Sequence, residues 1–143
     1  MVSKVPKHIA IILDGNRRYA KKLGLQLWKG HEFGVKKLEQ LLDWCIELGI
    51  KELTLYSFST ENFKRTKMEK DFLFKIFDRE FSNMKHKESI FKNKIRVNVI
   101  GRLNMFPKGI RKAMVDIMEK TKKHKNFIVN FAMAYGGRQE ITD

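Results

Sequence analysis

The chain has 143 residues and a mass of 16.9 kDa, which is enough for one domain with a hydrophobic core. Its composition, with 43% hydrophobic residues, 32% charged residues and only 2 prolines, excludes a disordered, collagen-like or low-complexity chain. The 30 Lys and Arg residues outnumber the 16 Asp and Glu residues, and the resulting net charge of +14 predicts an anionic partner: nucleic acid, an acidic membrane surface or a phosphorylated small molecule.

Two strands with a helix between them are predicted in the first part of the chain. The nearly continuous apolar run at residues 8–13 predicts a short strand that is buried on both faces. From His31 to Gly49, apolar residues recur every three or four positions, which predicts a helix that ends at the glycine. Residues 53–58 are rich in strand formers and predict the second strand.

The next predicted helix carries a start signal and many aromatic residues. Thr66 and Glu69 have the spacing of a capping box, in which each side chain accepts a hydrogen bond from the other residue's backbone N–H. We therefore expect a helix from Thr66 to about Lys87. Its apolar residues, rich in Phe, cover more than one face, which indicates core packing plus a subunit contact or a hydrophobic channel.

The alternation of strands and helices continues to the last residue. Residues 95–99 predict a third strand, Pro107 suits the start of a third helix, and residues 127–132 predict a fourth strand. The order predicts one α/β domain over residues 1–143, with a mostly parallel sheet and helices on both faces. Since residues 139–143 look like a helix that has barely begun, we expect a chain truncated after the fourth strand.

Cysteine content and hydropathy indicate the cellular compartment of the protein. Cys45 is the single cysteine, so an intramolecular disulfide is excluded, and its apolar neighbours predict a buried core residue. The longest apolar run is far shorter than the roughly 18 residues of a membrane-spanning helix, and the N-terminus lacks the features of a signal peptide. We expect a cytoplasmic protein, either free or peripheral at the membrane.

A first polar cluster, at residues 14–19, directly follows the first predicted strand. Ligands bind beyond the carboxyl ends of parallel strands, so this position favours a binding site. A carboxylate, a glycine and two arginines suit a magnesium diphosphate, with Asp14 on the cation and Arg17 and Arg18 on the phosphate oxygens. The alternative is an ordinary β-turn followed by two solvated arginines.

A second polar cluster, at residues 57–65, follows the second predicted strand and should meet the first cluster at the same edge of the sheet. It offers hydroxyls, a carboxylate and a carboxamide between aromatic residues. The alternative is a loop that leads to the cap at Thr66. His31, at the start of a predicted helix, is placed either to reach a phosphate or simply to begin the helix.

Four motifs in order resemble the cis-prenyltransferases, the undecaprenyl and dehydrodolichyl diphosphate synthases. They lie at residues 8–20, 30–31, 53–65 and 134–138, and they span almost the whole chain. Arg17 and Tyr19 are more similar to archaeal or eukaryotic members than to bacterial ones.

The resemblance implies an enzyme that condenses isopentenyl diphosphate with an allylic diphosphate, farnesyl or geranylgeranyl, to make a long-chain polyprenyl diphosphate. It implies Mg2+ as the cofactor, Asp14 as metal ligand and main catalytic residue, and Asn62 as an aid to proton removal. It implies a homodimer for the full-length form and makes the Phe-rich helix a wall of the tunnel for the prenyl chain. The implied substrate-binding residues are Gly15, Asn16, Arg17, Arg18, Tyr19, His31, Ser59, Thr60, Glu61, Phe63 and Arg65.

The chain departs from the family pattern in two respects. Leu27 occupies the place of an expected Arg, so one phosphate contact is absent or is replaced by Lys29. The second half of the family, with its isopentenyl diphosphate motif and a distal metal ligand, is also absent. Two alternatives stay open: a non-catalytic subunit of a two-component synthase, and a basic nucleic-acid-binding domain. Because the latter leaves both polar clusters unexplained, we expect no nucleic-acid partner.

Overall fold

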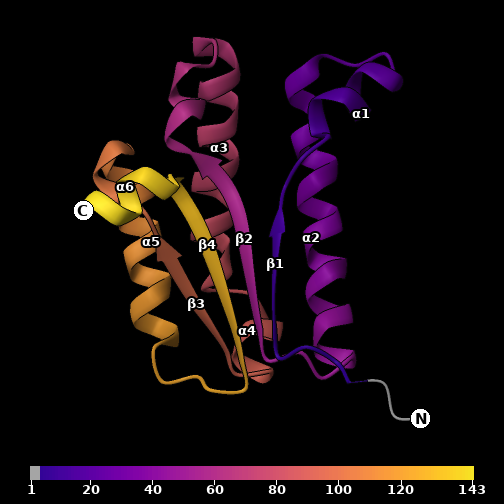
Figure 1. The fold of residues 1–143 in the computed structure, drawn as a ribbon, viewed down its shortest axis with the longest axis vertical. Coiled ribbons are helices and arrows are strands. Elements are labelled where there is room, and N and C mark those ends of the chain that lie inside the picture. The colour runs from indigo at the N-terminus through magenta and orange to yellow at the C-terminus, as the bar shows by residue number, and fades with distance from the viewer. Residues whose placement is uncertain (1–3) are drawn as a thin grey trace.

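The structure, a computed structural model, describes residues 4–143 and contains one four-stranded sheet (Figure 1). Its strands are β1 (His8–Ile12), β2 (Glu52–Ser59), β3 (Ile95–Ile100) and β4 (Phe127–Tyr135). They lie in the order β1-β2-β4-β3, and every neighbouring pair is parallel. The predicted α/β class with a parallel sheet is therefore confirmed.

Helices occupy every connection between the strands. The α-helices are α1 (Asn16–Lys22), α2 (Gly30–Glu47), α3 (Lys67–Met84), α4 (Glu88–Lys92), α5 (Lys108–Thr121) and α6 (Gly137–Thr142). Short 3-10 turns precede α2, follow β2 and precede α5: η1 (Leu27–Lys29), η2 (Thr60–Lys64) and η3 (Leu103–Met105). The three helices predicted from the sequence are confirmed by α2, α3 and α5. The sequence pattern gives no helix bounds for α1, which begins within the first polar cluster, or for α4. Within residues 4–143 no helix has the length and apolar character needed to cross a bilayer.

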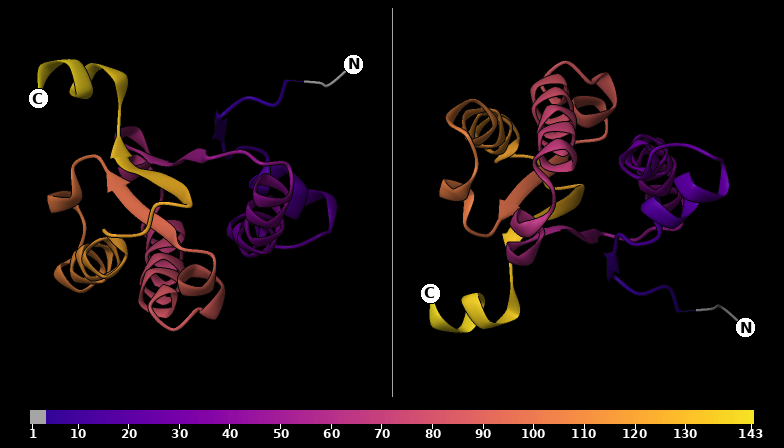
Figure 2. Two further views of the ribbon diagram at one scale, coloured as in Figure 1. Left: turned by 90° about the horizontal axis from the view of Figure 1, so that it is seen from below. Right: turned by 90° about the horizontal axis from the view of Figure 1, so that it is seen from above.

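The helices are distributed unequally over the two faces of the sheet. Figure 2 shows α2, α3 and α5 on one side of the strands, with only the short α6 on the other. This asymmetry explains the burial of β1, where Ile9 and Ile11 are half-buried while Ile12 is 75% exposed. The prediction that this strand is buried on both faces is therefore wrong for the described residues. β1 is an edge strand, and its outer face lies on the side that carries only α6.

The core between the sheet and α3 is largely aromatic. The ring of Phe58, on β2, lies with its centroid 4.9 Å from that of Phe63 and 5.5 Å from that of Phe77, both in edge-to-face geometry. Phe74 and Phe106 complete this cluster. Cys45 is 1% exposed, as its apolar neighbours predicted. The aromatic cluster fixes the start of α3 against the carboxyl end of β2, where the second polar motif lies.

Candidate functional site

The turn between β1 and α1 holds Asp14 and Arg18 together. Gly15 has a φ of 93°, a left-handed conformation that favours glycine, and it lets the chain reverse from strand into helix. Its N–H donates to Asp14 Oδ1 at 2.7 Å, and Arg18 Nη2 donates to Asp14 Oδ2 at 2.9 Å. Both side chains are at least 75% exposed, so they are accessible to a ligand.

Asn16 is held by the first turns of α2. A Cβ at Gly30 would collide with the carbonyl oxygen of Asn16, so only glycine allows α1 and α2 to approach this closely. The Asn16 Nδ2 atom lies 3.5 Å from His31 Nδ1. The geometry thus explains the Gly30-His31 pair. The glycine leaves room for the backbone of α1, and the histidine lies beside the side chain of Asn16, the first residue of α1.

Glu69 is a buried carboxylate that contacts three of the cationic or titratable side chains. It is 4% exposed, and its Oε1 atom accepts from Arg65 Nη1 at 3.1 Å. The same atom lies 3.5 Å from His31 Nε2 and 3.6 Å from Arg17 Nε. Glu69 therefore joins residues from α1, α2 and the segment that precedes α3.

This arrangement corrects the predicted capping box. Thr66 Oγ1 does accept from the backbone N–H of Glu69, at 3.3 Å, and caps α3 as expected. The Glu69 carboxylate, however, contacts Arg65, Arg17 and His31. A reciprocal capping box occurs earlier, where Ser59 Oγ accepts from Asn62 N and Asn62 Oδ1 accepts from Ser59 N.

The environment of His31 favours the neutral imidazole. Burial lowers its pKa from the usual 6.5, the hydrogen bond with Glu69 opposes this effect, and the nearby positive charges of Arg65 and Arg17 lower the pKa further. The net direction is downward because desolvation penalises the charged form of the ring.

A cleft of about 400 Å³ opens at this edge of the sheet. Its lining residues are Leu13, Asp14, Gly15, Asn16, Arg17, Arg18, Lys21, Leu27, His31 and Arg65. Apart from Asp14, whose carboxylate is paired with Arg18, every charged side chain in this lining is a Lys or Arg. The cleft therefore favours an anionic ligand.

Several candidate residues lie outside this lining. Ser59 and Asn62 bond to each other's backbone and shape η2, and Glu61 is exposed on the same turn. Thr60 Oγ1 lies beside Gly136, so β2 and β4 end at the same place. The catalytic and binding roles given to these residues stay predictions.

Two aromatic candidates also lie outside the lining. Tyr19 is half exposed and packs edge to face on Phe33, with centroids 5.4 Å apart. Phe63 belongs to the aromatic cluster around Phe58. Both side chains pack beside the elements that form the cleft, and their predicted contacts with substrate stay predictions.

Sequence reasoning missed Lys21 and Glu69. Lys21 lines the cleft because it lies one turn after Arg17 and Arg18 on α1, a spacing that is informative only once the helix is known. Leu27 and Lys21 line the cleft, whereas Lys29 does not, and the suggested replacement of a phosphate contact by Lys29 stays a prediction. Glu69 lies four residues after Arg65, the spacing of an ion pair on one helical face.

The residues of the cleft fit an Mg2+ ion that is shared with a substrate phosphate. Within residues 4–143 no three His, Cys, Asp or Glu side chains gather into a metal-binding group, so no protein cage exists there. Mg2+ is commonly held by one or two carboxylates together with substrate phosphates and water. Asp14, exposed and in the cleft, can supply one such carboxylate oxygen.

Fold and cleft together define a parallel α/β protein with a cationic cleft at the carboxyl edge of its sheet. Residues 12–143 match the model of a protein family described as putative undecaprenyl diphosphate synthase. The chain belongs to this undecaprenyl diphosphate synthase family.

Two archaeal relatives illustrate the similarity. The tritrans,polycis-undecaprenyl-diphosphate synthase (geranylgeranyl-diphosphate specific) of Thermococcus kodakarensis is 51% identical over 139 residues, which are 97% of this chain and 53% of the relative. The protein of the same name from Archaeoglobus fulgidus is 47% identical and is covered to 55%. The chain thus spans about half the length of the curated relatives it matches, and the archaeal-like features of the sequence agree with them.

Solved structures give the same result. Lavandulyl diphosphate synthase from Lavandula x intermedia, in complex with dimethylallyl diphosphate, superposes with a TM-score of 0.88 at 34% identity, over 95% of this chain and 58% of that one. A probable undecaprenyl diphosphate synthase from Campylobacter jejuni superposes with a TM-score of 0.77 at 36% identity, over 98% of this chain and 60% of that one.

Proposed function

We propose that this chain carries the allylic-substrate part of a cis-prenyltransferase, which condenses isopentenyl diphosphate with an allylic diphosphate to make a long-chain polyprenyl diphosphate. The observation that carries the proposal is the cleft, in which Arg17, Arg18, Lys21 and Arg65 surround one exposed carboxylate. The names of the archaeal relatives favour geranylgeranyl diphosphate as the allylic substrate.

The side chains of the cleft have distinct tasks in this proposal. Arg17, Arg18 and Lys21 bind the diphosphate and stabilise the negative charge that develops on it as the allylic bond breaks. Asp14 is the residue that would hold Mg2+, which supplies further neutralisation of the leaving group. The presence of both Asp14 and its arginine partner in one cleft favours a catalytic chain over a non-catalytic subunit.

The proposed role of Asn62 and the proposed tunnel for the prenyl chain rest on other observations. Asn62 is proposed to assist removal of the proton from the condensing substrate, since it lies on η2 at the carboxyl end of β2. The side chains of Phe74 and Phe77 are only half-buried on α3, which supports a tunnel wall for the growing hydrocarbon. The family resemblance further supports a homodimer of the longer form and a peripheral association with membranes.

Ligand binding by the 143-residue chain tests the proposal. A non-hydrolysable geranylgeranyl diphosphate analogue should bind in the presence of Mg2+, as measured by calorimetry. Because a charge-assisted contact is lost, Arg18→Ala should raise the Kd by about tenfold or more.

The matched control is Arg96→Ala, which removes an exposed arginine from β3 and should leave the Kd unchanged. An unchanged Kd in folded Arg18→Ala protein would show that the diphosphate does not bind in this cleft.

A further inference from the structure

The segment from α1 to the start of α2 is basic. Residues 15–31 contain no Asp or Glu, and their basic side chains are Arg17, Arg18, Lys21, Lys22 and Lys29. Residues 89–115 also lack Asp and Glu, whereas elsewhere acidic residues lie among the basic ones and form ion pairs such as Glu32 with Arg79. Arg18 pairs with Asp14 and Arg17 lies 3.6 Å from Glu69, but within residues 4–143 no carboxylate pairs with Lys21, Lys22 or Lys29.

The same segment exposes large apolar side chains. They are between 38% and 48% exposed, although side chains of this type are usually buried. These residues are Tyr19, Leu23, Leu25, Leu27 and Phe33. Lys21, Lys22 and Lys29 thus flank three exposed leucines on a short stretch of surface. Neither a purely polar surface nor a protein core requires this composition.

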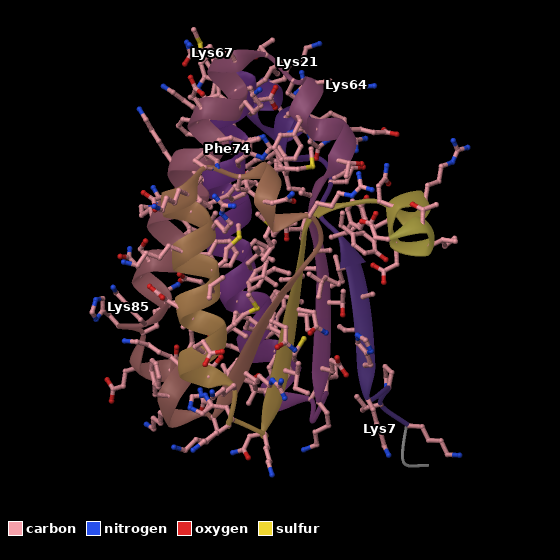
Figure 3. All side chains as sticks on the ribbon, turned by 90° about the vertical axis from the view of Figure 1, so that its left-hand side faces the viewer. Lys7, Lys21, Lys64, Lys67, Phe74 and Lys85 are labelled. Atoms are coloured by element: carbon pink, nitrogen blue, oxygen red, sulfur yellow. The ribbon has the colours of Figure 1, made fainter. Side chains whose placement is uncertain are left out.

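The segment lies at one end of the molecule. Figure 1 shows α1 beyond the carboxyl ends of the strands, and Figure 2 shows it at the outer margin of the helical layer. In Figure 3 the side chain of Lys21 lies at the same end as those of Lys64 and Lys67. Met68, adjacent to Lys67 in the first turn of α3, is 63% exposed. We call this surface, formed by residues 19–29 and 64–68, the basic end.

We propose that the basic end docks on an anionic phospholipid bilayer, with its leucines in the interfacial region and its lysines on the headgroups. Lysine side chains can extend to phosphates while neighbouring apolar groups enter the boundary of the acyl chains. A nucleic acid would pair with the lysines but would leave Leu23 and Leu25 in water, so lipid explains more of this surface. The inference locates the membrane association proposed above.

The mouth of the cleft supports the choice of lipid. Lys21 and Leu27 belong both to the basic end and to the lining of the cleft. Docking would therefore bring the cleft against the membrane, where a ligand with a hydrocarbon tail is concentrated. This link rests on the proposed function, but vesicle binding itself requires no prenyl transfer, so the two can fail independently.

Flotation with vesicles measures the docking directly. The 143-residue chain should bind vesicles that contain phosphatidylglycerol and should bind vesicles of phosphatidylcholine alone at least tenfold more weakly, since each basic residue adds to the attraction. Added salt should weaken binding because it screens the headgroup charge. Equal binding to both vesicle types, or none to either, would overturn the proposal.

Matched variants locate the contact. Lys22→Glu with Leu23→Ser should lower vesicle affinity at least tenfold, whereas Leu48→Ser with Lys51→Glu should leave it within about twofold. The two pairs remove the same charge and the same kind of exposed side chain, but the control pair lies at the amino end of β2. A second comparison changes charge alone: Lys22→Glu with Lys29→Glu, against Lys51→Glu with Lys125→Glu. Equal losses in test and control pairs would overturn the assignment of the surface.

The two tryptophans provide a geometric readout. Trp28 lies on η1 within the basic end, and Trp44 lies on α2 outside it. In Trp44→Phe protein, brominated lipids should quench Trp28 fluorescence, while in Trp28→Phe protein they should leave Trp44 unquenched. Quenching of Trp44 alone would overturn the proposal. Tight binding to an oligonucleotide without binding to anionic vesicles would also overturn it.

Discussion

Glu69 shows how one residue organises a cleft that it does not line. Its carboxylate is almost completely buried and contacts Arg17, Arg65 and His31. Breaking a buried ion pair leaves an uncompensated charge, which makes such a residue hard to replace. By accepting from Arg65 and lying beside Arg17, Glu69 limits the positions of two guanidinium groups before any ligand binds, so less ordering remains to be done on binding.

The environment of His31 leads to a prediction about acid stability. Burial holds its pKa below 6.5 in the folded chain, while the unfolded chain takes up a proton near the ordinary value. Stability contributed by this residue is present above pH 6.5 and is lost as the pH falls below it, because protons then favour the unfolded state. Thermal melting of wild type and His31→Gln at several pH values should show a difference that shrinks toward acid. Parallel curves would contradict the prediction.

Asp14 allows a second prediction at the scale of the residue. If its carboxylate holds Mg2+ on the diphosphate, Mg2+ should strengthen binding of the geranylgeranyl diphosphate analogue by wild type more than by Asp14→Ala. We expect the ratio of Kd values without and with Mg2+ to fall by roughly tenfold in the variant, the scale of a lost charge-assisted contact. Calorimetry checks this, and Asp116→Ala, a change on α5 away from the cleft, is the control. The same Mg2+ ratio in Asp14→Ala and wild type would exclude Asp14 as a ligand.

Among the elements, α2 and α3 are joined by charged side chains along their length. Arg79 on α3 donates to both oxygens of Glu32 at 2.9 Å, and Lys87, just beyond the end of α3, donates to Glu39 at 2.9 Å. At the cleft end, His31 and Glu69 make the corresponding contact. The exposed pairs each add only about 0.5 kcal/mol, but together they set the orientation of two helices that border the cleft.

The pairing of α5 with the outer edge of β3 yields a prediction about stability. Thr121 is completely buried, and its Oγ1 accepts from Val97 N at 2.9 Å and donates to Ile117 O at 2.8 Å. Thr121→Val keeps the shape but leaves the Val97 N–H without a partner, which should cost about 1–3 kcal/mol of unfolding free energy. Urea denaturation measures this value, with the exposed Thr142→Val as control. A loss of unfolding free energy below about 0.5 kcal/mol would show that the Val97 N–H finds another acceptor in the variant.

At the scale of the whole molecule, the two faces of the sheet are covered unequally, and the chain matches only part of the length of its relatives. One face of the sheet is covered by α2, α3 and α5, while Ile12 on the opposite side of β1 stays exposed. The archaeal relatives are almost twice as long as the chain, with 53% of the Thermococcus kodakarensis protein matched. The cationic side chains that line the cleft are Arg17, Arg18, Lys21 and Arg65, which are proposed to hold the allylic diphosphate.

This composition of the cleft predicts binding without turnover. The 143-residue chain should bind the allylic analogue, yet it should form no product from radiolabelled isopentenyl diphosphate and geranylgeranyl diphosphate with Mg2+, because the cleft is proposed to hold only the allylic substrate and attack requires both substrates to be oriented. Extraction and chromatography of labelled prenyl products measure the turnover. Products above background would show that residues 1–143 hold a complete site.

The sequence by itself determined the features that depend on local pattern. The alternation of strands and helices, the parallel α/β class and the membership of the family follow from hydrophobic periodicity and four motifs, and they are confirmed. The cluster at residues 14–18 was placed correctly beside a cleft because a polar turn after an apolar strand must lie at the edge of a parallel sheet.

Only the tertiary structure decided which residues from distant segments meet. Glu69 was read as half of a cap, yet packing of α3 beside α1 and α2 turns its carboxylate toward Arg17 and His31. Ile12 was expected inside, but its strand lies at the edge of the sheet, and strand order is not encoded in periodicity. The physical reason is the same in both cases: local pattern determines which elements form, whereas the order in which they pack determines which side chains are buried and which lie together.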